Sequence, residues 1–480
     1  MTETLVKTGV LKLSELLQAT YPAPGAESIT YWLATAYEGG ATTDGVQLGE
    51  VEVDSTGNMY LLSSMSSTTY GTDGADFVIT KLNAAGEFQW HKLLAGAAGG
   101  HENFGLISSG GSLAVDGDDN LIVAQTAQDR NGATTRTGFV AKISPAGSII
   151  WQRIQDVGGT DQSRGYACIA DKSTNDIYVC GELYDGPIAS TYSPYVVKYN
   201  SSGTEQWQIS FGTTGGNQGA KGIRLDTNGD VLVSGQDRSG ATRGMVAKLS
   251  KSTGAISWSR YIGNTTNNKG LNHMAMDGDD PIMVGFNQEN SSGSNDLWLV
   301  KYNNSGTYQW GRLLGGTGND QGYSIATDDS GNVYVGGFQA SDVAHTSVTN
   351  TVLLAKYNSS GTIQWQKRFT ADNNSGNISR ITGITIHPDG SLILAISSYN
   401  GAGSDYSIQV MKLPIDDTLW PSTVGDWSIA TSSLTDKAAS STQGSLSYTT
   451  STNSITSSAG AMTISDPSAS FTEVRDDISA

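Results

Sequence analysis

The sequence is poor in cysteine, in charge and in long apolar runs. Two cysteines in 480 residues exclude a disulfide scaffold and a zinc cluster built on cysteine. Only 15% of the residues are charged, so we do not expect long helices with salt-bridged outer faces. No stretch approaches the ~18 consecutive apolar residues that a membrane-spanning helix needs. We therefore expect no insertion into a membrane.

Motifs of metal and catalytic sites are also missing. The five histidines form neither a His-x-His pair nor a His-Glu-x-x-His pair. The chain has no G-x-x-x-x-G-K-[ST] phosphate loop and no G-x-S-x-G elbow. We expect a protein that is not an enzyme, with no catalytic residues, no metal site and no required cofactor.

The charge balance bears on partners and location. There are 28 basic and 46 acidic residues, a net charge of −18, which argues against nucleic acid as a partner because phosphates require a basic surface. The start, Met1–Leu5, has no basic segment followed by an apolar run, so we expect no signal peptide. Yet the chain favours Ser, Thr, Asn, Gly and Tyr, as extracellular proteins do. A viral structural protein, made in the host cytoplasm and exposed on a particle, fits both observations.

Glycine and aromatic residues are abundant. The 59 glycines are about 12% of the chain, against a usual ~7%. Apolar residues make up 37%, including 20 Tyr, 10 Trp and 9 Phe. That is enough to fill a large core, so disorder throughout is excluded. The composition indicates a large protein of short strands and turns.

Two sequence elements alternate along the chain. The first is a strand ending in Lys, a turn with Gly, and a strand that carries Trp. Its six full copies contain Lys81 and Trp90, Lys142 and Trp151, Lys198 and Trp207, Lys248 and Trp258, Lys301 and Trp310, and Lys356 and Trp365, and a seventh strand ends at Lys412. The second is an apolar strand, a tight turn opened by Asp, and another apolar strand. The turn residues are Asp54, Asp116, Asp171, Asp226, Asp277 and Asp328, with His387 in the seventh place. Asp and Gly suit such hairpins.

Each unit of about 55 residues therefore holds four short antiparallel strands, which is typical of a propeller blade. The count predicts an all-β, seven-bladed β-propeller over residues 28–413. The seventh unit lacks its Trp strand, and Trp32 lies 58 residues before Trp90, one repeat length. We expect residues 28–37 to supply that outer strand and to close the ring, which removes an exposed edge.

The segment Gly315–Gly337 resembles the SBBP-type repeat of seven-bladed β-propellers. The resemblance covers roughly residues 28–413. It implies the fold, and it implies little about activity, since such repeats occur both in bacterial surface proteins and in tailed-phage virion proteins.

Two extensions flank the predicted ring. In residues 1–27, the segment 14–19 is predicted to be a short helix with Ser14 as N-cap, ending before Pro22. Residues 414–480 are dominated by Ser and Thr. They are either a disordered tail or an arm that becomes ordered against neighbouring subunits, with alternation around residues 444–464 suggesting added strands. Both ends leave the ring near blade 7, so we expect a single attachment point.

Features that recur in every blade are expected to be structural. The lysines form either a cationic ring or, as we favour, stems packed between blades that meet a carboxylate or carbonyl. We expect the tryptophans to pack the outer strands rather than to stack against carbohydrate. The acidic turns 116–120 and 277–280 offer oxygens to Ca²⁺, but they lack the full spacing of a Ca²⁺ loop. Cys168 and Cys180 are expected to be buried thiols on opposite faces of a hairpin.

Function is expected where the blades differ. Seven variable loops fall on one face, at residues 63–76, 125–138, 182–194, 235–244, 286–297, 338–351 and 397–407. Tyrosines stand among their small polar residues, a mixture that suits adaptable recognition. The candidate binding residues are Tyr70, Tyr184, Tyr192, Tyr399 and Tyr406.

The favoured function is a non-enzymatic structural protein of a tailed-phage virion. Residues 1–27 and 414–480 would bind other virion proteins, the chain would form a homo-oligomer in the particle, and the ring would contact a host surface glycan or protein. One alternative is a bacterial surface adhesin or glycan-binding propeller. Another is an enzyme of the lyase or quinoprotein type, which requires His, Arg or metal ligands that converge on the central axis.

Overall fold

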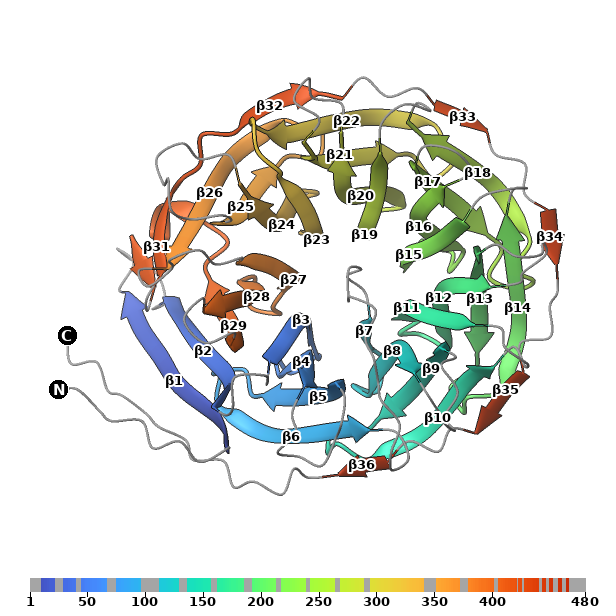
Figure 1. The fold of residues 1–480 in the computed structure, drawn as a ribbon, viewed down its shortest axis with the longest axis horizontal. Coiled ribbons are helices and arrows are strands. Elements are labelled where there is room, and N and C mark those ends of the chain that lie inside the picture. Colours follow the sequence, from blue (N-terminus) through green and yellow to red (C-terminus); the bar gives the residue numbers. More distant parts are fainter. Residues whose placement is uncertain are drawn as a thin grey trace.

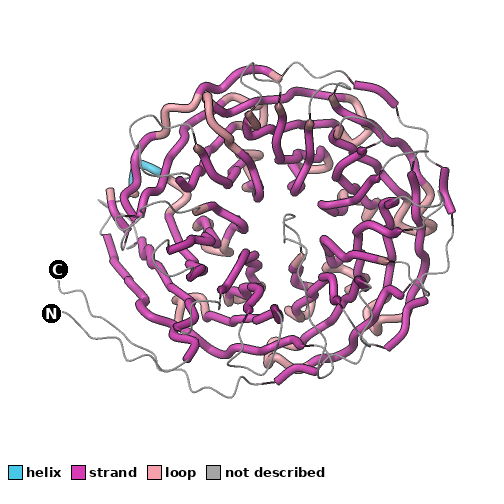
Figure 2. The backbone as a smooth tube through the Cα atoms, viewed as in Figure 1, coloured by secondary structure: helices cyan, strands magenta, loops and turns pink. Residues whose placement is uncertain are grey.

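The computed structural model describes residues 10–465 with gaps between strands. The segments outside the description are 1–9, 22–28, 40–44, 67–74, 96–111, 129–135, 157–161, 185–191, 213–216, 239–241, 264–267, 289–293, 341–350, 372–378, 401–404, 421, 425–426, 440–442, 446–448, 452–455, 460–462 and 466–480. Within the described part, most of the chain is strand, joined by turns and loops (Figure 2), and no helix is long and apolar enough to cross a membrane.

The strands form seven sheets arranged in a ring, as expected (Figure 1). Blade 1 contains β3 (Gly45–Val53), β4 (Met59–Ser66), β5 (Ala75–Leu82) and β6 (Phe88–Ala95), and blade 2 contains β7 (Leu113–Val115), β8 (Leu121–Gln128), β9 (Arg136–Ile143) and β10 (Ile149–Asp156). Blade 3 contains β11 (Ser163–Ala170), β12 (Ile177–Tyr184), β13 (Tyr192–Tyr199) and β14 (Glu205–Gly212), and blade 4 contains β15 (Asn217–Leu225), β16 (Val231–Arg238), β17 (Arg243–Leu249) and β18 (Ile256–Ile262).

The remaining blades repeat this order. Blade 5 contains β19 (Lys269–Asp277), β20 (Asp280–Asn287), β21 (Asp296–Tyr302) and β22 (Tyr308–Gly315), and blade 6 contains β23 (Gln321–Thr327), β24 (Val333–Gln339), β25 (Thr351–Tyr357) and β26 (Ile363–Ala371). Blade 7 contains β27 (Arg380–Ile386), β28 (Leu392–Asn400), β29 (Asp405–Leu413) and β2 (Ile29–Gly39). The first strand of each blade lies nearest the central axis and the fourth lies near the rim (Figure 1).

The ring closes through β2, as the sequence predicts. In blade 7, β2 pairs with β29, and Trp32 stands opposite Lys412. The same Lys–Trp register recurs in the other blades, for example between Lys81 and Trp90. The seventh blade is therefore built from both ends of the ring.

The helix predicted at residues 14–19 is wrong. That segment lies in β1 (Val10–Tyr21), which pairs along its whole length with β2. A helix of six residues is marginal in water, whereas the edge of β2 offers backbone partners along its length. β1 thus adds a fifth strand to blade 7.

The Ser/Thr-rich arm follows the rim of the chain's own ring. After a short 3₁₀ turn, η1 (Asp417–Leu419), it forms the seven strands β30 (Thr423–Val424), β31 (Trp427–Thr431), β32 (Thr435–Ala438), β33 (Gln443–Ser445), β34 (Thr449–Ser451), β35 (Thr456–Ala459) and β36 (Thr463–Ser465). β31 to β36 pair antiparallel with the outer strands of blades 6, 5, 4, 3, 2 and 1, in that order. The added strands expected around residues 444–464 exist in the described part of the arm, where they pair with the edges of this chain's own blades. We call β1 and β30–β36 the belt.

The described core lies between blades rather than in a single centre. Each cluster of buried apolar side chains joins two neighbouring sheets. Cys168 belongs to the cluster between blades 2 and 3 and Cys180 to the one between blades 3 and 4. Both thiols are buried and unbonded to each other, as predicted, and burial raises the pKa of each. Each blade is therefore held mainly by its neighbours.

The repeated lysines and tryptophans connect neighbouring blades or turns. Lys142 and Lys301 pair with Asp116 and Asp277 of their own blades, both at 2.6 Å. The Trp258 indole N–H donates to the Asn304 carbonyl of the next blade at 3.0 Å. Equivalent bonds run from Trp90, Trp151, Trp207 and Trp310. These contacts support the structural interpretation of both residue types.

Candidate functional site

Two tyrosines from the predicted set lie together at the outer ends of β12 and β13. Tyr184 ends β12, Tyr192 begins β13, and the two residues are paired in register. Their ring centroids are 5.1 Å apart at 59°, and both side chains are partly exposed. This end of blade 3 is opposite the tight turn at Asp171, so the pair lies on the face of the variable loops, which we call the loop face.

Arg164, on the innermost strand β11, holds this pair in place. One of its nitrogens, Nη1, lies 2.5 Å from Oε1 of Glu182, and Nη2 donates to the Tyr192 hydroxyl at 3.2 Å. The guanidinium also lies 4.8 Å from the centroid of the Tyr192 ring. A planar guanidinium supports both an ion pair and aromatic contact. Arg164 therefore links the central strand to the loop-face tyrosines.

Two β-bulges place a second cation–aromatic contact beside Arg164. The register of β11 skips Tyr166, and that of β15 skips Lys221. A bulge re-aims the side chain of the extra residue, and here the Lys221 ammonium lies 3.8 Å from the centroid of the Tyr166 ring. Burial lowers the pKa of Lys221 to about 8, with Glu182 acting against that shift and Arg238 and Arg164 adding to it. The two bulged residues join blades 3 and 4 near the axis.

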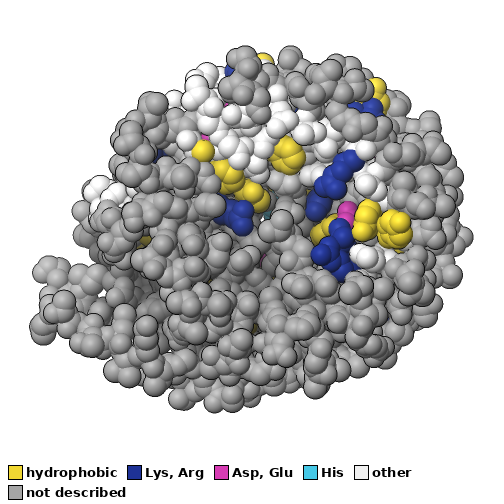
Figure 3. Space-filling model, viewed as in Figure 1, with side chains coloured by type: hydrophobic (Ala, Val, Ile, Leu, Met, Phe, Trp, Pro, Cys, Tyr) yellow, Lys and Arg dark blue, Asp and Glu magenta, His cyan; other side chains and the backbone are white. Residues whose placement is uncertain are grey.

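Arg238 completes the group at the end of β16. It is exposed, and its Nη2 donates to the Gln236 side chain at 2.7 Å. Arg164, Lys221 and Arg238 thus lie together near the carboxylate of Glu182. Figure 3 shows Lys and Arg side chains gathered beside the centre of this face, next to hydrophobic or aromatic ones. We call Arg164, Tyr166, Tyr184, Tyr192, Lys221 and Arg238 the cationic corner.

The other predicted tyrosines do not join this group in the described structure. Tyr70 lies outside the described residues. Tyr399 and Tyr406 stand opposite each other where β28 and β29 meet, in blade 7, and only their backbone is described. The sequence interpretation also missed Arg164, Lys221 and Arg238. One signal was present: Tyr166 and Lys221 each stand five residues before a turn Asp, at a position that differs from blade to blade.

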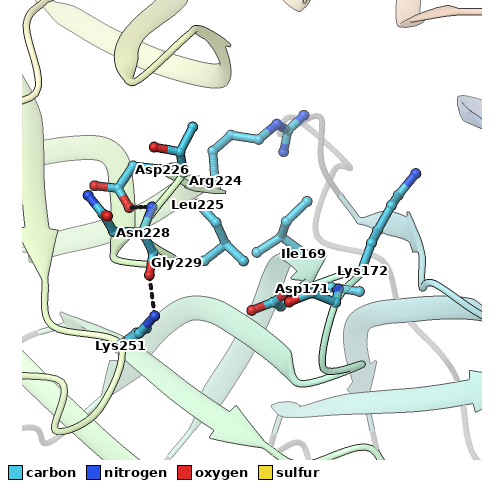
Figure 4. Close-up of a pocket in the computed structure, with 12 residues that line it drawn as sticks. Ile169, Asp171, Lys172, Arg224, Leu225, Asp226, Asn228, Gly229 and Lys251 are labelled. Atoms are coloured by element: carbon cyan, nitrogen blue, oxygen red, sulfur yellow. Dashed lines mark hydrogen bonds between the residues drawn. The ribbon is translucent and has the colours of Figure 1, made fainter.

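A pocket of about 360 Å³ opens on the opposite face, between the tight turns of blades 3 and 4. In Figure 4, Ile169 and Leu225 lie side by side in the middle, while Arg224 and Lys172 extend away from the turn residues. The remaining lining consists mainly of turn residues such as Asp171 and Asn228. Its size suits a small molecule, but its charges are mixed and its carboxylates already accept hydrogen bonds from their own turns or from lysine.

In the acidic turns considered as Ca²⁺ sites, Asp116 and Asp277 already interact with donor groups of the protein itself. Asp116 accepts hydrogen bonds from the backbone N–H groups of Asp118 and Asn120 and pairs with Lys142. Asp277 pairs with Lys301. These contacts are typical of a hairpin turn in which a lysine compensates the charge of the aspartate. The geometry gives no support to Ca²⁺ binding at these turns.

The comparisons with known proteins concern the fold. Residues 309–337 match the family model described as SBBP, a beta-propeller repeat. Among curated proteins, none matches this sequence. Solved structures with similarity include the polysaccharide lyase Uly1, at 11% identity and a TM-score of 0.47, covering 85% of this chain and 100% of that one. A protein of unknown function from Dyadobacter fermentans matches at 11% identity and a TM-score of 0.42, over 78% of this chain and 96% of that one. A europium-containing methanol dehydrogenase matches at 11% identity and a TM-score of 0.40, over 85% of this chain and 92% of that one. We take no function from them.

Proposed function

We propose that this chain, a seven-bladed propeller with an SBBP repeat, is a non-enzymatic structural and interaction protein of a tailed-bacteriophage particle. Its terminal segments anchor it to other virion proteins and its loop face is displayed. The observation that carries the proposal is the position of the belt's two described ends. Val10 begins β1 on blade 7, and Ser465 ends β36 on blade 1. Because β27, β28 and β29 contact β3, these blades are neighbours.

The course of the belt supports a single attachment point. The C-terminal arm passes blades 6 to 1 in order and returns to the blade beside the N-terminal strand. Segments 1–9 and 466–480 therefore start from adjacent blades, on one side of the ring. Anchoring through both leaves the other blades and the loop face open to a host surface or to further copies of the chain.

The first test is mass spectrometry of purified particles, which should detect this chain as a virion component. The second compares the full chain with one trimmed to residues 10–465. The trimmed chain should keep its melting temperature, because every described belt strand remains, and should fail to enter particles. Particles that lack the full chain, or that incorporate the trimmed one equally well, would contradict the proposal.

A second candidate is a glycan-binding propeller on a bacterial surface, which the cationic corner favours because it joins aromatic rings with positive charge. Its discriminating observation is location. Immunolabelling of intact cells in the absence of phage should detect a bacterial surface protein, whereas a virion protein appears only after infection.

A further inference from the structure

We propose that the pocket between the tight turns of blades 3 and 4 binds a small organic carboxylate, with its carboxylate at the Lys172 N–H and its apolar body on Ile169 and Leu225. The pocket has a volume of about 360 Å³, and every residue that lines it lies in the described part of the chain. Because it opens on the face opposite the loop face, this inference goes beyond the proposed function and does not depend on it.

The first argument is a hydrogen bond that other blade junctions have and this one lacks. At three junctions of this face, the N–H of the residue after the turn Asp donates to a side-chain oxygen in the tight turn of the next blade. These bonds run from Ser55 to Asp119, from Gly117 to Asn175 and from Thr227 to Asp279, at 2.8 or 2.9 Å. Between blades 3 and 4 the donor is the Lys172 N–H, and Gly229 stands where Asp119 does. Within the described residues this N–H has no hydrogen-bond partner, so a ligand oxygen can take the place of the side-chain acceptor.

The second argument is the positive charge beside Gly229. A Cβ placed on Gly229 would lie 3.5 Å from the Lys251 ammonium, which donates to the Asn228 carbonyl. The exposed side chain of Lys172 lines the same pocket. Neither ammonium forms an ion pair with a carboxylate of the described chain. An entering carboxylate therefore gains charge-assisted hydrogen bonds, which are the stronger kind.

The two carboxylates in the lining are compatible with a third. Asp226 pairs with Lys248 at 2.7 Å, and Asp171 accepts from the Ser173 N–H at 2.9 Å. At two of the three other junctions, the acceptor is itself an aspartate bonded to the residue after the turn Asp. These turns therefore tolerate a second carboxylate at this place.

Arg224 also lines the pocket, but its charge is engaged elsewhere. Its Nη2 lies 2.8 Å from Nε2 of His273. Glu52 of blade 1 interacts electrostatically with Arg224 and Lys172, although no ion pair joins it to either within the described residues. The ligand's carboxylate is therefore assigned to the Gly229 end of the pocket.

The third argument is the apolar surface in the pocket. Ile169 and Leu225 come from the innermost strands β11 and β15, are half-buried, and lie side by side in Figure 4. Contact with the hydrocarbon part of a ligand would remove this surface from water, which is favourable. An apolar floor with a few polar groups is the usual composition of a small-molecule site. An organic acid uses both parts, whereas an inorganic anion uses only the donors.

The test is isothermal titration of the full chain with 4-methylpentanoate, a probe that joins a carboxylate to a branched apolar body. Its controls are 4-methylpentanamide, which has the same body without the charge, and acetate, which has the charge without the body. We expect saturable binding of the probe, at least about tenfold weaker binding of both controls, and weaker binding as salt is raised.

Two variants and a matched control locate the site. Gly229→Asn brings its own acceptor into the pocket, so it should lower the affinity for the probe by about tenfold or more. Lys251→Met removes an exposed ammonium and should also weaken binding about tenfold. The control is Gly390→Asn, which should leave binding unchanged. Gly390 lies in the tight turn of blade 7 with a φ of +84°, and nothing is within 4 Å of its Cβ.

No binding of the probe, equal binding of the amide or of acetate, or equal effects of Gly229→Asn and Gly390→Asn would overturn the site. Asparagine tolerates the positive φ of both glycines, so a loss of binding that is confined to Gly229→Asn does not report unfolding. The assay uses isolated protein, so its result is separate from that of the particle-incorporation test.

Discussion

In blades 2 and 3, one residue near the end of the tight turn joins the blade to the preceding one. Asp119 accepts hydrogen bonds from the backbone N–H and the hydroxyl of Ser55 in the preceding blade, at 2.9 and 2.7 Å. Asn175 likewise accepts from the N–H of Gly117 at 2.8 Å. Asp119 and Asn175 are the two non-glycine residues with positive φ in the described chain. In blade 4 the corresponding residue is Gly229, and there the pocket opens.

The substitution Gly229→Asn should therefore stabilise the junction of blades 3 and 4. Gly229 has φ of +82°, and a Cβ there would meet the flexible end of Lys251 at 3.1 Å and, at an ordinary contact distance of 3.7 Å, Oδ2 of Asp171. Asn tolerates this conformation better than most residues, and its amide oxygen can accept from the Lys172 N–H. We expect a gain of about 1 kcal/mol in the free energy of unfolding, measured by chemical denaturation. The converse change Asp119→Gly should cost a similar amount, and a loss of stability for Gly229→Asn would count against the assignment.

At the scale of elements, the Gly turns of blades 3 to 6 each pack against a tryptophan of the preceding blade. A Cβ at Gly306 would lie 2.7 Å from Cδ2 of Trp258, and the same indole donates to the Asn304 carbonyl of that turn. Gly203, Gly254 and Gly361 stand in the same relation to Trp151, Trp207 and Trp310. Glycine is required here for two reasons. Its backbone has a positive φ, and the indole ring lies too close to leave room for a Cβ.

The two requirements can be separated by substitution. Gly306→Ala should destabilise the protein by about 3 kcal/mol, because a left-handed alanine and an overpacked indole each contribute. Gly390→Ala has a similar φ of +84° but nothing within 4 Å of its Cβ, so it should cost about 1 kcal/mol. Thermal or chemical unfolding compares the two. Equal losses would mean that the indole does not rest on the turn.

The repeats in the sequence predicted most elements of the ring because each blade contains its own alternating apolar strands and its own Asp and Gly turn residues. The register of Lys81 with Trp90 and the closing strand at Trp32 both follow from spacing alone. Alternation suggested added strands around residues 444–464, but β1, β30–β32 and the course of the belt along the rim could not be found this way. Strands such as β33 and β34 have three residues each, and their pairing comes from the edges that they cover rather than from an apolar pattern. In the candidate site, Tyr184 and Tyr192 were predictable as loop residues, whereas Lys221 is brought there by a bulge.

At the scale of the whole molecule, the belt covers the outer edge of every blade. Its first part also packs into the core: Trp427 is 1% exposed in the cluster of blades 6 and 7, and Trp420 packs edge-on against Trp365 with ring centroids 5.2 Å apart. Farther along, the Tyr357 hydroxyl donates to Asp436 at 3.1 Å. The arm is therefore anchored firmly at blades 6 and 5 before its shorter strands follow the rim.

Deletion of residues 414–480 should lower the melting temperature and cause aggregation that increases with concentration. The ring still closes through β2, but six outer strands become free edges, and blade 6 loses the packing of Trp420 and Trp427. Deletion of residues 440–480 is the control. It keeps β30–β32, so it should lower the melting temperature less. Scattering and thermal melts measure both, and a monomeric, equally stable product of the larger deletion would contradict this account of the belt.

The central claim is that the belt covers the ring of its own chain, and a cysteine cross-link tests it most directly. Arg312 and Ala438 stand opposite each other where β32 joins β22. In the double variant Arg312→Cys/Ala438→Cys, mild oxidation should give a cross-linked monomer on non-reducing gels, while each single variant gives none. A cross-linked dimer would show that the arm covers a second copy, and no cross-link at all would show that it does not lie on this edge.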